Sequence, residues 1–215
     1  MRAKEFIIEA NHRNIDLDGI ISTIKRECAP FLRLTDVPMY RGMSIGMNKN
    51  TFFAKVPTLA FRNPRDTPAV FNNYIVAWFK DHFGFPFRQV HSMFATGALG
   101  VSDGYGLSFM VFPRGDFHFT WSPFIGDLTD RFSEGTKQFT ADEIASQVDE
   151  VMDDGEYQFD QGLTQAIHSR NEITFICESY YILNVYDLRH FCNMQGLRYE
   201  DVIRRIFENT YYENQ

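Results

Sequence analysis

Hydrophobic residues recur along the chain at two different spacings, and each spacing predicts a different kind of element. Apolar side chains three and four residues apart predict helices over residues 14–34, 67–84 and 140–152. Two shorter helices are predicted over residues 186–212, separated by Gly196. Runs rich in β-branched and aromatic side chains predict strands over residues 37–43, 52–61, 90–96, 107–112 and 117–121, and two more within 172–184.

Individual residues indicate where several of the expected helices begin or end. Asn14 or Asp16 is expected to cap the first helix, and Thr67 followed by Pro68 is expected to begin the second. Gly84 suits the left-handed conformation that commonly ends a helix. The apolar stripe of this second helix is expected to pack on a sheet.

Two further signals lie in the middle of the chain. Thr140 and Glu143 form a capping box at the start of the third helix. Residues 113–116 have turn composition and predict a hairpin that joins the strands over 107–112 and 117–121. Residues 97–106 are expected to form a glycine-rich turn or a short helix.

The mixture of helices with consecutive strands predicts an α+β fold. Because the sequence contains no repeats, low-complexity segments or linkers, we expect a single domain over residues 1–215. Within it we expect an N-terminal helical region over 1–36, a β core over 37–185 and C-terminal helices over 186–215.

Arg41 interrupts the apolar strand over residues 37–43. With a period of two, Val37, Met39, Arg41 and Met43 share one face, so the guanidinium should point where core side chains point. A buried, unpaired charge is costly, so Arg41 should meet a carboxylate or the anionic group of a ligand. The alternative is an edge-strand arginine that reaches water.

Composition adds an aromatic-rich interior and an acidic surface to this picture. The chain has 22 phenylalanines and 10 tyrosines among 215 residues. A chain of this length buries about 70% of its unfolded surface. The net charge of −7 argues against general affinity for nucleic acid or anionic membranes, although a local basic groove stays open.

Cysteine usage and hydropathy favour a cytoplasmic protein. The three cysteines are widely spaced and form no CxxC pair, which argues against a disulfide framework or a zinc knuckle. Residues 1–13 lack the apolar core of a signal peptide, and no run approaches about 18 apolar residues. We therefore expect no membrane partner.

Candidate chemistry has to come from polar residues within strands, because the common phosphate-loop, dinucleotide, zinc-protease and serine-hydrolase motifs are absent. The polar residues are Arg41, His91, Ser92, Thr96 and Glu172. An ionised Glu172 would stabilise positive charge developing on a sugar ring. The alternative is a structural ion pair between Arg41 and Glu172.

Three short segments resemble the Arg, Ser-Thr-Ser, Glu pattern of ADP-ribosyltransferases. They are residues 40–42 (Tyr-Arg-Gly), 94–97 (Phe-Ala-Thr-Gly) and 172–175 (Glu-Ile-Thr-Phe), each on a predicted strand. The resemblance spans residues 40–183 and implies two small facing β-sheets with surrounding helices that clasp NAD, which is a substrate here.

The resemblance also implies a role for each matching residue. Arg41 would bind the NAD phosphate or ribose, Thr96 would support the glutamate, and Glu172 would stabilise the ribose cation. The residues expected to bind NAD are Tyr40, Arg41, Gly42, Ser92, Phe94, Thr96 and Arg65. Arg65 belongs to a cluster with Arg62 and Asp66 that either contacts the NAD phosphates or forms a turn and helix cap.

The chain departs from the family pattern at several positions. Ala95 and Gly97 stand where serines are expected, and Arg170 stands where many members carry Glu or Gln. Glu178 is a second candidate for the catalytic carboxylate because it shares strand parity with Glu172. These departures leave the acceptor undetermined.

The leading hypothesis is a transferase of the glycosyltransferase class. It would transfer ADP-ribose from NAD to a macromolecular acceptor, either protein or nucleic acid, and release nicotinamide. The alternative is a non-catalytic protein-interaction module derived from the same fold. A metal-dependent hydrolase built from the scattered histidines is a third, weaker hypothesis.

Overall fold

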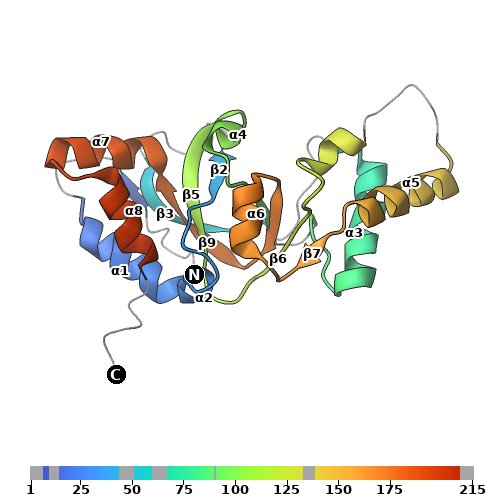
Figure 1. Cartoon of the computed structure of the whole chain (residues 1–215), viewed down its shortest axis with the longest axis horizontal. Coiled ribbons are helices and arrows are strands. Elements are labelled where there is room, and N and C mark those ends of the chain that lie inside the picture. The colour runs from blue at the N-terminus through green and yellow to red at the C-terminus, as the bar shows by residue number, and fades with distance from the viewer. Residues whose placement is uncertain are drawn as a thin grey trace.

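Two β-sheets occupy the middle of the molecule, and helices gather at its two ends (Figure 1). The computed structural model describes residues 7–9, 15–43, 51–59, 67–89, 91–132 and 139–208. Every strand pairing in both sheets is antiparallel. The predicted α+β class is therefore confirmed.

The larger sheet has five strands in the order β1-β3-β9-β5-β2. Its strands are β1 (Ile7–Glu9), β3 (Thr51–Pro57), β9 (Ser179–Asn184), β5 (Leu107–Pro113) and β2 (Tyr40–Met43). β9 is buried along its whole length because β3 and β5 flank it on either side. β2 lies at the edge, so Arg41 is on an edge strand of this sheet.

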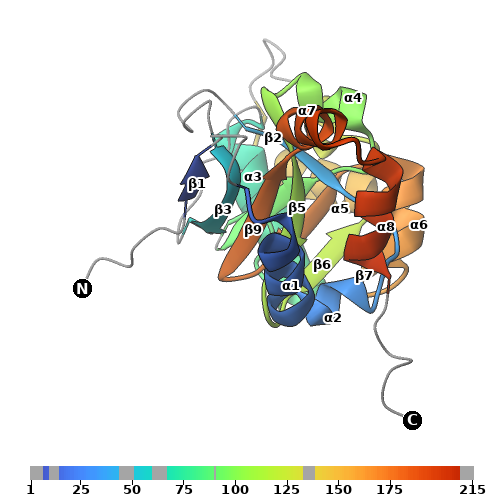
Figure 2. The same cartoon turned by 90° about the vertical axis from the view of Figure 1, so that its left-hand side faces the viewer.

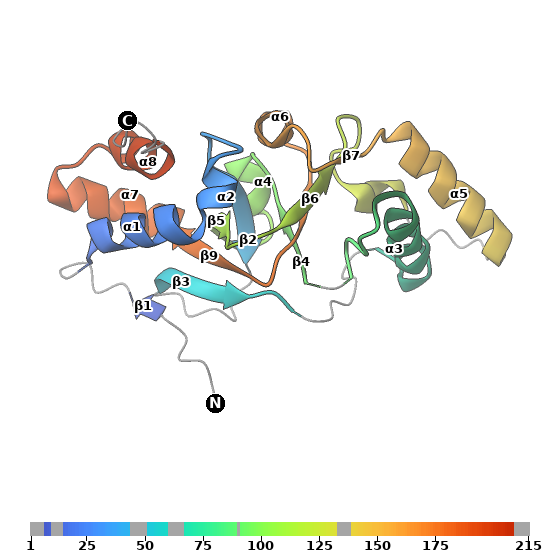
Figure 3. The same cartoon turned by 90° about the horizontal axis from the view of Figure 1, so that it is seen from below.

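The smaller sheet has four strands in the order β4-β8-β6-β7. Its strands are β4 (Ser92–Ala95), β8 (Ile173–Ile176), β6 (His118–Trp121) and β7 (Gln158–Phe159). Seen from below, β4 and β6 lie between β2 and the helices at the far end of the molecule (Figure 3). The predicted break near residues 177–179 is confirmed, and it separates β8 in one sheet from β9 in the other.

The predicted hairpin between residues 107–112 and 117–121 is wrong. β5 pairs with β2 and β9, whereas β6 pairs with β8 and β7. The turn residues at 113–116 therefore carry the chain from one sheet to the other. A turn signal specifies a change of direction, and which strands pair depends on packing elsewhere in the chain.

Four helices cover one end of the larger sheet. They are α1 (Leu17–Glu27), α2 (Ala29–Leu32), α7 (Val185–Gln195) and α8 (Tyr199–Phe207). Figure 2 looks at this end and shows α1, α7 and α8 around the strands. Asp16 caps α1 by accepting from the amide of Gly19, and Gly196 separates α7 from α8 as predicted.

The other end of the molecule is a helix pair with its own apolar cluster. α3 (Ala69–Phe83) packs against α5 (Ala141–Asp154), next to the 3-10 helix η1 (Leu128–Arg131). The cluster is built from Phe71, Ile75, Trp78, Phe79, Phe87, Ile125, Leu128, Phe132, Ile144, Val148 and Met152. The stripe of α3 therefore packs mainly on a helix, and not on a sheet as predicted.

At the other end of the molecule, two helix ends agree with the sequence signals and one differs. Gly84 ends α3 with a φ of 77°, and the Thr140–Glu143 capping box begins α5. The predicted cap of α3 by Thr67 is wrong, because Pro68 occupies the cap position without a side-chain bond. The Thr67 hydroxyl instead accepts from Arg88.

Two short helices complete the fold. α4 (Leu99–Asp103) confirms the short-helix alternative for residues 97–106, and α6 (Leu163–Ser169) was not predicted. Phenylalanines dominate the largest fully buried side chains, which confirms the aromatic-rich interior. Among the described residues, no helix is long and apolar enough to cross a membrane.

Candidate functional site

The two sheets are linked where β2 passes β4. Tyr40 and Thr96 form an isolated antiparallel bridge, in which the Tyr40 amide donates to the Thr96 carbonyl at 2.7 Å and the Thr96 amide donates back at 2.9 Å. In the smaller sheet Ala95 pairs with Ile173, the residue after Glu172. The bridge and this pairing bring all three segments of the predicted pattern to one junction.

The strand faces decide which side chains meet at this junction. Met93 and Ala95 point into the main core, so Ser92, Phe94 and Thr96 lie on the opposite face of β4. On β8, Ile173 and Phe175 point into the same core. Glu172 therefore belongs to the face that carries Phe94 and Thr96.

Arg41 contacts the backbone of β4 from the neighbouring sheet. Its side chain is half-buried, and Nη1 donates to the Phe94 carbonyl at 2.9 Å. Its Nε is buried without a hydrogen-bond partner, and no carboxylate of the described residues forms an ion pair with it. The predicted carboxylate partner is therefore not found within the described part of the chain, where the neutral carbonyl of Phe94 is the group that accepts from Arg41.

Glu172 is paired with an arginine that the sequence did not point to. Nη1 of Arg88 lies 2.6 Å from Oε1 of Glu172, and the two side chains are 6% and 22% exposed. Nη2 of Arg88 donates to the Thr67 hydroxyl at 3.1 Å, and the guanidinium lies over the Phe94 ring at 4.8 Å. The predicted alternative, an ion pair between Arg41 and Glu172, is therefore wrong for the described residues.

Arg88 lies in the connection between α3 and β4, outside the strand pattern that pointed to Arg41. Its φ of 72° places it in a conformation that few non-glycine residues adopt. A signal was present in the sequence: Arg88 follows Phe85, Pro86 and Phe87, so it is a charge in an otherwise apolar run. The same reasoning that singled out Arg41 applies to it.

Thr96 was expected to support the glutamate, and its hydrogen bonds are with the backbone near Glu172 and not with the carboxylate. Its hydroxyl donates to the carbonyl of Arg170 at 2.8 Å and accepts from the Ala98 amide at 3.1 Å. The Glu172 amide donates to the Gly126 carbonyl at 2.7 Å. These bonds fix the position of the backbone from which the Glu172 side chain extends.

Gly42 and Gly97 of the pattern lie so close to neighbouring backbone that a side chain would not fit. A Cβ built on Gly97 would lie 1.7 Å from the carbonyl oxygen of Ile167, and one on Gly42 would lie 2.0 Å from that of Ser102. Neither position accepts a side chain without a backbone shift. A serine is therefore sterically excluded at position 97, where the family pattern has one.

The remaining predicted site residues lie elsewhere or outside the described residues. Tyr40 turns its side chain away from this junction, into a pocket beside α7 and α8. Ser92 is buried at the opposite end of β4 from Thr96. Glu178 is exposed and follows β8, whereas Glu172 precedes it, so the two are about 20 Å apart along the strand. Arg65, with Arg62 and Asp66, lies outside the described residues.

The groups near Arg41 and Glu172 do not supply a nucleophilic thiolate or a metal ligand set. Burial raises the pKa of Cys177 to about 12, although the positive charge of Arg41 opposes that shift. Burial and the Glu172 charge also raise the pKa of Tyr157, so both groups stay protonated at neutral pH. Within the described ranges, no group of three His, Cys, Asp or Glu residues could hold a metal ion.

Comparison with protein-family models, with curated proteins and with solved structures gave no significant match. The function therefore has to be argued from the junction itself.

Proposed function

We propose that this chain transfers ADP-ribose from NAD to a macromolecular acceptor and releases nicotinamide. One observation carries the proposal: Arg41 is half-buried with an unpartnered Nε, at the junction of the two sheets, where Glu172 immediately precedes β8. A guanidinium in this state is suited to bind a phosphate, because an anionic ligand would supply the missing charge partner.

The reaction assigns a separate task to each side chain. The Arg41 guanidinium binds the pyrophosphate of NAD. The bond between C1′ of the ribose and the nicotinamide nitrogen breaks, and its electron pair leaves with nicotinamide. The Glu172 carboxylate stabilises the positive charge that develops on the ribose. A nucleophile of the acceptor then bonds to C1′ and loses its proton to solvent.

The magnitude of this stabilisation depends on Arg88. A carboxylate at about 4 Å from the ribose cation contributes about 4 kcal/mol at an effective dielectric constant of 20. Arg88, at 2.6 Å from Glu172, reduces the net negative charge at the site while it holds the carboxylate in one position. Arg88 is therefore a positioning residue in this mechanism.

The ion pair between Arg88 and Glu172 is also the observation that favours the second candidate function. A glutamate already neutralised by a buried arginine can be purely structural. The chain would then be a protein-interaction module that binds no NAD. The acceptor class, protein or nucleic acid, stays undetermined in the first case.

The test is turnover of labelled NAD by the purified chain, in the presence of cell extract with and without nuclease. Glu172→Gln is expected to lower turnover by about 100-fold or more, because it removes a charge that acts on the transition state. Glu178→Gln is the matched control, since it changes the same residue type at the far end of the same strand. Nuclease sensitivity of the label identifies a nucleic-acid acceptor.

The same experiment separates the two candidate functions. NAD turnover that is equal in the wild type and in Glu172→Gln would contradict the catalytic assignment. A fall in Glu178→Gln alone would move the catalytic role to that residue. The absence of any NAD-dependent thermal shift in the wild type would support the interaction module.

A further inference from the structure

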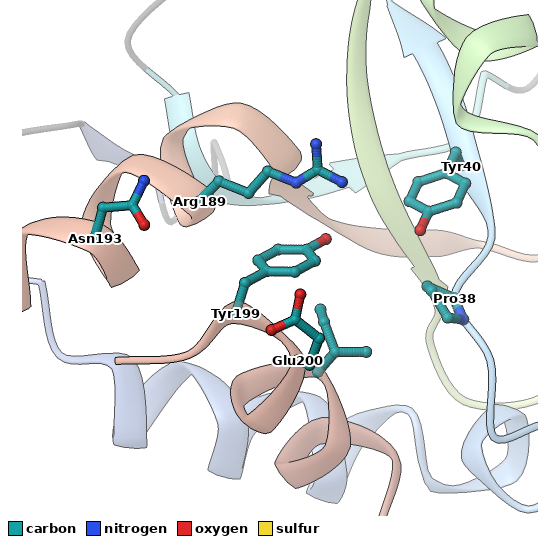
Figure 4. A pocket seen from close by; sticks show the side chains of 7 residues that line it. Pro38, Tyr40, Arg189, Asn193, Tyr199 and Glu200 are labelled. Atoms are coloured by element: carbon teal, nitrogen blue, oxygen red, sulfur yellow. The ribbon is translucent and has the colours of Figure 1, made fainter. Parts of the chain in front are cut away.

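A pocket of about 400 Å³ lies beside β2, α7 and α8 (Figure 4). Tyr40 of β2 lines this pocket, whereas Arg41, the next residue, reaches toward Phe94 in the smaller sheet. Successive side chains of a strand point to opposite faces, so β2 itself separates the pocket from Arg41. The pocket is therefore distinct from the candidate NAD site.

Arg189 of α7 supplies a positive charge in the wall of this pocket. Its guanidinium lies 4.9 Å from the centre of the Tyr199 ring, and Figure 4 shows it directed toward the pocket. No carboxylate of the described residues forms an ion pair with it. Stacking on the tyrosine holds the fork of donors in place without neutralising its charge.

Tyr199 supplies a second donor. Its hydroxyl oxygen is buried beside the Arg189 guanidinium but meets no partner in good hydrogen-bond geometry, which is unfavourable unless a ligand provides one. Burial raises the pKa of Tyr199 to about 12 and also raises the pKa of Tyr40. Both phenols therefore keep their protons at neutral pH and are able to donate to an acceptor.

The rest of the lining is suited to an apolar body. Pro38, Ile203 and the two tyrosine rings provide hydrophobic surface, and Asn193 adds an amide. A volume of about 400 Å³ exceeds what one inorganic anion fills, since a water molecule occupies about 30 Å³ of liquid. Glu200, at the start of α8, is the negative charge in the lining, and it is exposed.

We propose that this pocket binds a small molecule in which an anionic group is joined to an aromatic ring. The anionic group is bound by Arg189 and the Tyr199 hydroxyl, and the ring lies against Tyr40, Pro38 and Ile203. A carboxylate and a phosphate ester share this chemistry. Glu200 disfavours the second negative charge of a phosphate.

The experiment measures binding of four probes to the full chain with ¹³C-labelled tyrosines. Phenylacetate and phenyl phosphate carry both the ring and the anion, benzyl alcohol carries only the ring, and inorganic phosphate carries only the anion. We expect the first two to shift the ring signals of Tyr40 and Tyr199, which are assigned from Tyr40→Phe and Tyr199→Phe. The other two should bind at least about 10-fold more weakly.

Two substitutions that remove charges of opposite sign from the pocket make the test specific. Arg189→Ala should weaken binding of phenyl phosphate about 10-fold or more, whereas Glu200→Gln should tighten it about 2-fold to 5-fold. Tyr199→Phe should weaken binding without lowering the thermal stability, because it removes a buried hydroxyl that has no well-placed hydrogen-bond partner. Arg204→Ala is the matched control, since Arg204 pairs with Asp201 on α8 outside the pocket.

Several results would overturn the proposal. They are the absence of any shift with either ring-bearing anion, unchanged affinity in Arg189→Ala, and equal binding of benzyl alcohol. Loss of phenyl phosphate binding in Arg41→Ala would also overturn it, because the anion would then bind on the other face of β2. None of these results depends on NAD turnover, so this proposal and the proposed function fail independently.

Discussion

The ion pair between Arg88 and Glu172 gives a prediction with a defined magnitude. Arg88→Met removes the ion pair at 2.6 Å, the bond to Thr67 at 3.1 Å and the contact with the Phe94 ring. The Arg88 side chain is only 6% exposed, so water compensates little. We expect the free energy of unfolding to fall by about 3–5 kcal/mol, as is typical when one partner of a buried pair is removed.

Glu172→Gln is a milder change because the amide oxygen still accepts from Arg88. We expect it to cost about 1–2 kcal/mol, which is the difference between a charged and a neutral hydrogen bond. In the Arg88→Met background the guanidinium of Arg88 no longer favours the carboxylate, so the same substitution should cost about 1–2 kcal/mol less than in the wild type. The coupling energy of the double-mutant cycle is then about 1–2 kcal/mol.

Urea unfolding followed by tryptophan fluorescence measures all four corners of the cycle, with Trp78 of α3 as a reporter near the site. Effects of the two substitutions that add within about 0.5 kcal/mol would refute the reasoning, because they would mean that the two side chains do not interact in solution. NAD turnover by Arg88→Met completes the test. A catalytic Glu172 predicts a loss of turnover in this variant at temperatures where it is folded.

Three more predictions concern stability. Gly97→Ser should destabilise the chain by about 1–3 kcal/mol in thermal melts. The control Gly100→Ser should cost about 1 kcal/mol or less, because a Cβ at this position meets nothing within 4 Å. Equal costs of the two substitutions would contradict the steric argument. Arg114 holds the pKa of Glu27 at about 2, below its usual 4.5, so Glu27 adds stability above about pH 4.5 that is lost as the pH falls toward about 2. Urea melts between pH 5 and pH 2.5 should therefore show a shallower pH dependence for Glu27→Gln, by about 1–2 kcal/mol after solvent screening, and an unchanged slope would refute this. Thr140→Ala should cost about 1 kcal/mol in urea melts, because it removes the capping box of α5, and Thr140→Ser should restore most of it.

Local elements were predictable from the sequence because their signals are local. The Asp16 cap, the Thr140 capping box and the Gly84 end are each decided by bonds within one turn of the helix. The break near residues 177–179 was visible because a strand of thirteen residues would exceed the usual length of about six. These features do not depend on what the element packs against.

Strand partners and the packing of α3 were not predictable in this way. The turn at residues 113–116 looks the same whether the following strand folds back or enters another sheet. The stripe of Phe71, Ile75 and Trp78 likewise specifies an apolar face without specifying its partner, which is α5. Such choices depend on contacts that are distant in sequence, and no single window of residues encodes them.

The candidate site combines both kinds of information. Arg41 was found from a local conflict, a charge in an apolar strand, and the structure leaves its Nε buried and unpartnered. The Arg88–Glu172 pair depends on a contact between residues 84 positions apart, so Glu172 was identified without its partner. Arg88 carries the same local signal as Arg41, a charge next to apolar residues, but in a connection and not in a strand.

The position of Arg41 relative to Glu172 depends on how the chain passes between the sheets. β8 and β9 are separated by Cys177 and Glu178 alone, yet they belong to different sheets. Thr58 holds this crossing, because its amide and its hydroxyl both donate to the Glu178 carbonyl at 3.0 Å. At the other end of β8, the Tyr40–Thr96 bridge ties the sheets together again. Strand β2 is therefore fixed against the smaller sheet, with Arg41 on one face and Tyr40 on the other. A ligand in the pocket of Tyr40 and a ligand at Arg41 would contact the same short strand, although each would be recognised by different side chains.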